Sequence, residues 1–194
     1  TRGCRHLVLS GGEPTLFREL PHLICEAVAA GFSRITIQSN GIGFASKNYA
    51  EGVIRAAKGA QLTVVLSLHG NDQGLHDFHT GRIGSFDEVM RTFHNLRGHC
   101  TLFTNSVVTK VNIDHLSEIL DVALANEVST SQFSILHVAN LSNETLRPAF
   151  IEAADAIRRV CGRVIPISIR SEGVPFCLMK GVESGVGEAY WPLH

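Results

Sequence analysis

The alternation of strand-like and helix-like segments constrains this fold more than any other feature of the sequence. Strand-like segments at 34–38, 62–68 and 102–108, the first of them alternating with Ile35 and Ile37 on one face, are each followed by apolar side chains at helical spacing. The unit recurs about every 30 residues, which is the usual length of a βαβ crossover. Strands joined by helical crossovers run parallel, so the sequence predicts an α/β fold with helices packed outside a parallel sheet.

Six strands are expected in all, and the sequence makes four further predictions about the strands and their connections. The predicted strands are 7–9, 34–38, 62–68, 102–108, 132–138 and 164–169. The unbroken apolar strand 62–68 should be covered on both faces, and Pro166 should place a bulge or edge in the last strand. The connection 69–84 is polar and rich in histidine, and Ser85 with Glu88 predicts a capping box at the next helix. We expect residues 1–172 to form the α/β domain and residues 173–194 an irregular tail.

Composition favours one globular domain. The chain has 194 residues, of which 44% are hydrophobic and 18% charged, with a formal net charge of −1. The sequence has no basic run of the kind that would predict nucleic acid or an anionic membrane as a partner. It also has no apolar run long enough to span a bilayer. The five cysteines are widely spaced without a CxxC pair, which favours reduced, mostly buried thiols in a cytoplasmic protein.

A glycine-rich loop follows the first strand and contains the strongest candidate site. Gly11 and Gly12 allow a ligand to approach the backbone without meeting a Cβ atom, and Glu13 adds a carboxylate beside them. Pro14 ends the strand. A loop of this kind suits a small ligand that carries an ammonium group.

The tetrapeptide Gly11–Pro14, placed after an apolar strand, resembles the GGEP motif of the radical S-adenosylmethionine (radical SAM) enzymes. The resemblance covers roughly residues 5–140 and extends less closely to 178. It implies a partial (β/α) barrel, in which ligands lie at the carboxyl ends of the strands. It also implies that the loop binds the amino group of S-adenosylmethionine (SAM), which the family cleaves to methionine and a 5′-deoxyadenosyl radical.

Polar residues also follow the other predicted strands, and parallel strands end on one side of a sheet. The resemblance implies that Ser39, Asn40 and Ser67 lie near the carboxylate and ribose of SAM. It further implies that Asn105 belongs to the next strand of the site, and that His137 and Val138 border the adenine. Turn formation remains the alternative for each serine and asparagine, because such residues favour strand ends in any case.

His69, His76 and His79 fall within one connection, and Cys177 follows the last strand. The histidine spacings do not match a standard zinc site, so loop structure or substrate contact is the preferred interpretation and no metal ligand is assigned. Cys177 resembles a cysteine that helps some radical SAM enzymes bind an auxiliary cluster, but a buried thiol is the simpler interpretation. The remaining histidines are expected at the surface or at helix caps. No catalytic residue can be named.

The resemblance departs from the family at one point, since the sequence contains no CxxxCxxC motif. In the family those thiolates hold a [4Fe-4S] cluster, so the cluster is expected only in a full-length parent. The first strand and first helix of the barrel are expected to be missing as well. A shortened chain and a natural non-catalytic descendant both remain open, and in either case this polypeptide alone should generate no radical.

Three functions follow from these observations. The first is the SAM-binding part of a radical SAM enzyme that acts on an unknown substrate. The second is a non-catalytic module that binds a nucleotide, a SAM-like ligand or a partner, with self-association through the open sheet edge. The third is an unrelated barrel enzyme that uses Glu13 as an acid, which is disfavoured because no second carboxylate is expected at a neighbouring strand end.

Overall fold

Six parallel strands form one open sheet in the order of the sequence. The computed structural model describes residues 3–136, 141–163, 165–173, 178–179 and 181. Within these residues every neighbouring pair of strands is parallel, in the order β1-β2-β3-β4-β5-β6. The strands are β1 (His6–Leu9), β2 (Arg34–Ser39), β3 (Gln61–Ser67), β4 (Thr101–Val108), β5 (Thr130–Ile135) and β6 (Ser168–Glu172).

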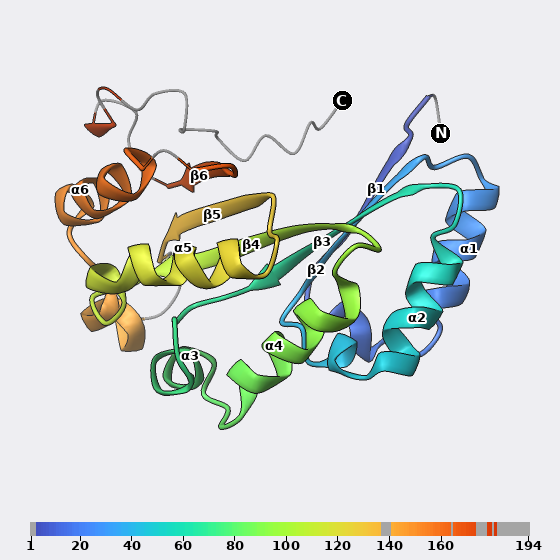
Figure 1. Ribbon diagram of the computed structural model, residues 1–194, viewed down its shortest axis with the longest axis horizontal. Coiled ribbons are helices and arrows are strands. Elements are labelled where there is room, and N and C mark those ends of the chain that lie inside the picture. The colour runs from blue at the N-terminus through green and yellow to red at the C-terminus, as the bar shows by residue number, and fades with distance from the viewer. Residues whose placement is uncertain (1–2, 137–140, 164, 174–177, 180, 182–194) are drawn as a thin grey trace.

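Because each strand is added on the same side of the previous one, the right-handed crossovers place the helices along one face. Figure 1 shows the helices along the outer side of the curved sheet. The α-helices are α1 (Leu20–Ala29), α2 (Lys47–Ala56), α3 (Gln73–Thr80), α4 (Ser85–Leu96), α5 (Leu116–Ala125) and α6 (Phe150–Cys161). Short 3₁₀ helices are η1 (Pro14–Leu16), η2 (Gly43–Ala45), η3 (Ile113–His115) and η4 (Leu141–Leu146). This arrangement confirms the α/β class and the partial-barrel architecture.

The two faces of the sheet differ in composition. On β3, the side chains of Leu62, Val64 and Leu66 belong to the buried core, whereas Thr63, Val65 and Ser67 are half-buried on the other face. Successive residues of a strand point to opposite faces, so the helices cover only one of them. The prediction that 62–68 is covered on both faces is therefore wrong. The inner face is left for a cleft.

Several predicted boundaries also differ from the structure. The strand predicted at 132–138 is β5, which begins at Thr130 and ends at Ile135. The last strand lies after Pro166 rather than around it. A helix that was not predicted, α3, occupies part of the polar connection 69–84, because Asp72 caps it through a 2.8 Å bond from the Leu75 amide to Oδ1.

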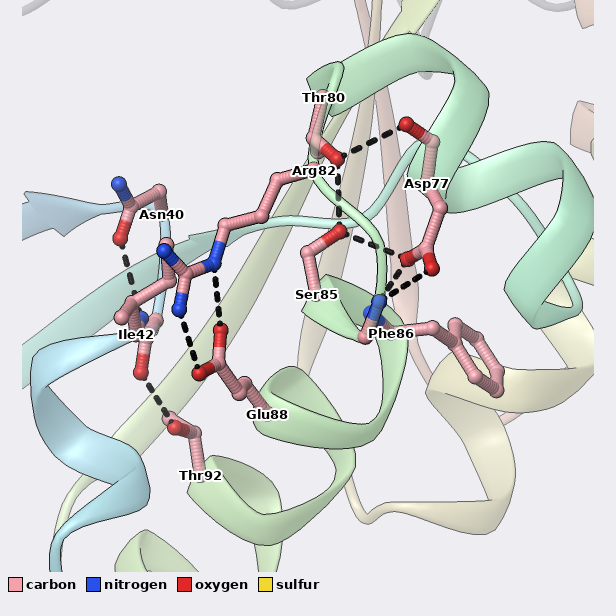
Figure 2. A network of polar contacts seen from close by, with 11 residues as sticks. Asn40, Ile42, Asp77, Thr80, Arg82, Ser85, Phe86, Glu88 and Thr92 are labelled. Carbon is pink, nitrogen blue, oxygen red and sulfur yellow. Dashed lines mark hydrogen bonds and ion pairs between the residues drawn. The ribbon is translucent and has the colours of Figure 1, made fainter.

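The predicted capping box at Ser85 and Glu88 does not form. The residue before α4 is Gly84, in the left-handed conformation, and it makes no side-chain cap. Figure 2 shows that Asp77 of α3 performs this role instead. Its carboxylate accepts bonds from the Gly84 and Phe86 amides and the Ser85 hydroxyl at 2.5, 3.0 and 2.8 Å. Desolvation opposes ionisation of Asp77, but these hydrogen bonds outweigh it and lower the pKa of Asp77 to about 2.

Helix α4 also holds the loop that follows β2. The Thr92 hydroxyl donates to the Gly41 carbonyl at 2.6 Å (Figure 2). The side-chain amide of Asn95 donates to the carbonyls of Phe44 and Ala45 at 2.9 and 3.2 Å. These contacts fix the tip of β2, which forms part of the cleft described below.

The predicted tail begins at Gly173 and lies mostly outside the described residues. Of that part of the chain, Met179 is fully buried and belongs to the core. In the segments that the structure describes, no helix is both long enough and apolar enough to cross a membrane.

Candidate functional site

A cleft with a volume of about 830 Å³ lies on the inner face of the sheet. It is lined by residues from all six strands and from the loops that follow β1 and β2. The lining residues are His6, Gly11, Gly12, Glu13, Arg34, Thr36, Gln38, Ser39, Asn40, Gln61, Thr63, Val65, Leu66, Ser67, Phe103, Thr104, Asn105, Gln132, Arg170 and Glu172. The size falls within the range of small-molecule sites, roughly 300–1,000 Å³.

The predicted glycine loop lies at this cleft with its backbone open. Gly11 has a φ of +107°, which favours glycine, and an added Cβ at Gly11 or Gly12 would meet nothing within 4 Å. Glycine is therefore required by the backbone only at position 11. At Gly12 the chain itself would tolerate a methyl group, so the space beside it is available to a ligand.

The Glu13 carboxylate joins the loop after β1 to the tip of β2. Oε1 accepts bonds from the Thr15 amide (3.0 Å), the Thr15 hydroxyl (2.8 Å) and the Ser39 hydroxyl (2.8 Å). Oε2 accepts one bond, from the Asn40 amide at 2.7 Å. A carboxylate has about four acceptor sites, two on each oxygen. Oε1 is therefore crowded, whereas Oε2 keeps capacity for a further donor.

Most of the predicted site residues lie together. Gly11, Gly12 and Glu13 line the same cleft as the four polar residues predicted at the following strands, namely Ser39, Asn40, Ser67 and Asn105. Pro14 is not among the lining residues; it is the first residue of η1. His137 and Val138 lie outside the described residues.

Sequence reasoning missed the rest of the inner face. Thr36, Gln38 and Gln132 line the cleft from the middle of strands rather than from their tips. For β2 the available signal was the period of two along the strand, where Thr36 and Gln38 alternate with buried Ile35 and Ile37. Attention to strand ends alone could not find them.

His6 was expected at the surface or at a cap, and this prediction is wrong. Its ring lies in the cleft, with Nε2 at 2.9 Å from the Thr36 hydroxyl. Burial, and then the positive charge of Arg34, lower the pKa of His6 below its ordinary value.

The three clustered histidines are structural. The His69 amide donates to Nδ1 of His76 at 3.1 Å, and the Val107 amide donates to Nδ1 of His69 at 3.2 Å. Nδ1 and Nε2 of His79 lie 2.8 Å from the Leu75 carbonyl and from the Thr109 hydroxyl. These bonds tie α3 to the ends of β3 and β4, which agrees with loop structure as the preferred interpretation. Among the described residues no group of three or more His, Cys, Asp or Glu side chains could hold a metal ion.

Tyr49 of α2 lies near the site without a hydrogen bond. Its hydroxyl is buried and has no partner in the described part of the chain. Burial, and then the negative charge of Glu13, raise the pKa of Tyr49. An unpaired buried hydroxyl costs about 1–3 kcal/mol of desolvation.

Tyr49→Phe should therefore be neutral or raise the free energy of unfolding, by about 1 kcal/mol. The ring would keep its contact with Phe44, whose centroid is 5.8 Å away. Urea unfolding of both proteins measures the difference. A loss of more than 1 kcal/mol would mean that the hydroxyl has a partner after all.

The described cysteines do not form a cluster site. Cys4 and Cys25 are exposed, and Cys100 and Cys161 are half-buried; all four are free thiols. The expectation of mostly buried thiols is therefore wrong for the first two. Burial raises the pKa of Cys100 to about 12 and also raises that of Cys161, which disfavours the thiolate form that binds iron. Cys177 lies outside the described residues. The described thiols thus do not fit a [4Fe-4S] cluster.

Solved structures with the same fold include SAM-bound proteins. One is titled native anSMEcpe with bound AdoMet and Kp18Cys peptide; it has a TM-score of 0.66 and 16% sequence identity. The match covers 82% of this chain and 47% of that chain. Another is Streptococcus suis SuiB bound to S-adenosylmethionine, with a TM-score of 0.63 and 19% identity over 80% of this chain and 35% of that one. At such identities the likeness shows the fold.

Two curated relatives carry the name "Probable GTP 3′,8-cyclase". The protein of Sulfurisphaera tokodaii is 28% identical over 173 residues, which are 88% of this chain and 53% of the relative. The protein of Sulfolobus acidocaldarius is 28% identical over 144 residues, or 73% of this chain and 44% of the relative. The chain thus spans about half the length of these relatives. The sequence profile of the Radical SAM superfamily matches residues 1–123, and the chain belongs to that superfamily.

Proposed function

We propose that this chain binds SAM at the tips of β1 to β4 and forms the SAM-binding part of a radical SAM enzyme. The observation that carries the proposal is that the open Gly11–Gly12 backbone, the Glu13 carboxylate and polar residues of β2, β3 and β4 meet in one cleft. SAM supplies a 5′-deoxyadenosyl group in this family, and the residues named here would bind and orient it.

Glu13 has two functions in this proposal. Through Oε1 it holds the loop after β1 against Ser39, and through Oε2 it meets the Asn40 amide. The remaining acceptor site on Oε2 can take one N–H of the SAM ammonium group. A charge-assisted bond of this kind contributes about 1.5–3 kcal/mol.

The polar groups beyond Glu13 suit the rest of the cofactor. Asn40 follows the end of β2, Ser67 is the last residue of β3, and Asn105 of β4 pairs with Ser67, so the three lie along the cleft. The side-chain oxygen of Asn40 already accepts a bond from the Ile42 amide at 3.0 Å, which leaves its NH₂ group as a donor. The hydroxyl of Ser67 and the amide of Asn105 can serve the carboxylate and ribose of SAM as donors and acceptors.

Two variants test the site by isothermal titration with SAM. Glu13→Gln should weaken SAM binding roughly 10- to 100-fold, the effect of losing one charge-assisted bond. Gly12→Ala should also abolish or strongly weaken binding, because the methyl group would occupy the space of the ligand and disturb nothing in the chain itself. Glu19→Gln, an exposed carboxylate at the start of α1, is the matched control and should bind SAM as the natural chain does.

The comparison of the two variants separates folding from binding. Gly12→Ala should unfold at the same temperature as the natural chain, whereas Glu13→Gln should lose stability because the loop contacts to Thr15 and Ser39 weaken. The proposal fails if the natural chain gives no saturable heat with SAM, or if Gly12→Ala binds SAM unchanged.

We also propose that this polypeptide does not hold a [4Fe-4S] cluster by itself. The sequence contains no CxxxCxxC motif, and the four described cysteines are dispersed over the fold. Anaerobic reconstitution with iron and sulfide should therefore leave less than stoichiometric iron on the purified chain. One cluster per chain, found by iron analysis and Mössbauer spectroscopy, is the result that contradicts this.

A non-catalytic module remains the second candidate, and one observation favours it. Among the described strands, β1 pairs only with β2, so its other edge offers unpaired backbone groups. A second copy or another chain could pair there. Light scattering that shows only monomers at high concentration would remove self-association from this candidate.

A further inference from the structure

The inner face of β4, β5 and β6 holds a second group of polar side chains that the proposed SAM site does not use. Gln132 of β5 and Glu172 of β6 line the cleft, and Ser134 of β5 contacts both. Gln132 and Glu172 lie 40 residues apart in sequence, and the parallel register of β5 and β6 brings them together.

Hydrogen bonds fix this group in place. The Gln132 amide donates to Oε2 of Glu172 at 2.6 Å, and the Ser134 hydroxyl lies 3.1 Å from the same oxygen. The Ser134 hydroxyl also lies 2.9 Å from Oδ1 of Asn105. Both contacts to Glu172 are made by Oε2, so Oε1 is not involved in either. The side-chain NH₂ group of Gln132 donates its two bonds to Ser134 and Glu172, and its carbonyl oxygen takes no part in them. The face therefore presents two oriented acceptors to a ligand.

Phe103 and Arg170 lie beside these acceptors. The guanidinium carbon of Arg170 lies over the Phe103 ring, 5.8 Å from its centre, and both residues line the cleft. No ion-pair partner of Arg170 occurs in the described part of the chain. An aromatic ring with an adjacent guanidinium provides a stacking surface for a flat ligand.

The charges restrict what can bind here. Glu172 disfavours an anion, and Arg170, two residues along the same strand face, disfavours a cation. An uncharged ring in which an N–H group stands beside a carbonyl is compatible with both charged residues. The N–H can donate to Glu172, and the carbonyl can accept from Arg170.

We propose that the inner face of β4–β6 is the substrate subsite, and that it takes an uncharged planar ring of the lactam or imide type. Glu172 accepts the ring N–H, Arg170 donates to the carbonyl, and Phe103 stacks on the ring face. The assignment of this ligand as the substrate rests on the proposed function, because SAM at the tips of β1 to β4 leaves this face for a second molecule.

Uridine is a suitable probe, because its one ring N–H stands between two carbonyls. Titration in saturating SAM, followed by NMR, should show saturable binding of uridine to the natural chain. 3-Methyluridine keeps the ring and lacks the N–H, and it should bind roughly tenfold more weakly or not at all. Glu172→Gln should weaken uridine binding by a similar factor and remove the preference over 3-methyluridine. Glu51→Gln, at a half-exposed carboxylate on α2 outside the cleft, is the matched control and should change neither.

The outcomes are distinct. Equal binding of the two nucleosides, equal binding to Glu172→Gln, or no binding of uridine overturns the subsite even if SAM binds normally. Binding of uridine that depends on Glu172, in a chain that does not bind SAM, supports the subsite and overturns the proposed function instead. Glu172→Gln that binds SAM with unchanged affinity shows that the cleft remains folded.

Discussion

Gly70→Ala is expected to destabilise the fold by about 3 kcal/mol or more, the upper range for overpacking a core. Gly70 follows β3 and is buried against the start of α3. An added Cβ would lie 2.4 Å from the His76 backbone nitrogen and 2.7 Å from the Leu75 carbonyl carbon. These are backbone atoms of a helix and cannot turn aside. The helix would have to move away, which breaks the 3.1 Å bond between the His69 amide and His76.

Gly74→Ala is the matched control. Gly74 lies inside α3, and its nearest neighbour to an added Cβ is Oδ1 of Asp72 at 3.4 Å, an ordinary contact. Alanine should therefore stabilise the helix by about 0.5–1 kcal/mol relative to glycine. Urea unfolding of the three proteins gives both differences. If the two variants lose similar stability, α3 responds to any change in this region and the close approach at Gly70 is not the cause.

The chain should also lose stability on acidification from pH 7.5 to pH 5, by about 2 kcal/mol for each of His69 and His76. Burial, and then the neighbouring His76 and His79, lower the pKa of His69 to about 3. Burial also lowers the pKa of His76 to about 4; Asp77 opposes this shift and His79 adds to it. Each Nδ1 accepts a backbone N–H, which requires the neutral ring.

The direction follows from proton binding. In the unfolded chain both histidines take up a proton below the ordinary pKa of 6.5, whereas in the folded chain they stay neutral down to about 4 and 3. Between these values the unfolded state binds more protons, so stability falls as the pH falls. The carboxylate of Asp77, whose pKa is lowered from 3.8 to about 2, loses its contribution between these two values, which lie below this window.

Two measurements check this prediction. Urea unfolding at the two pH values should show the loss, and His76→Gln should reduce it by about 2 kcal/mol. His99→Gln, an exposed histidine before β4, should leave the loss unchanged. NMR titration of the natural chain gives an independent readout, since the two rings should show no protonation above pH 5. A titration of both rings near pH 6.5 would contradict the buried, neutral state.

Much of the architecture could be predicted because it depends on local patterns. The strand-like patterns of β2, β3 and β4, each followed by apolar side chains at helical spacing, predict parallel strands without any knowledge of which strands pair. The tips of parallel strands share one side of a sheet, which is why Gly12, Ser39 and Asn105 could be expected at one cleft. The cap of α4 was harder to predict from the sequence, because it comes from Asp77 of another helix rather than from Ser85.

The sequence by itself determined the class of fold, its six strands and the loop at Gly11–Glu13, since these follow from the spacing of residues along the chain. Only the tertiary structure decided that Oε1 of Glu13 is occupied by Thr15 and Ser39, and that Gln132 meets Glu172. The physical reason is that a hydrogen bond depends on positions within about 3 Å. The register between distant strands sets those positions, and no local pattern encodes them.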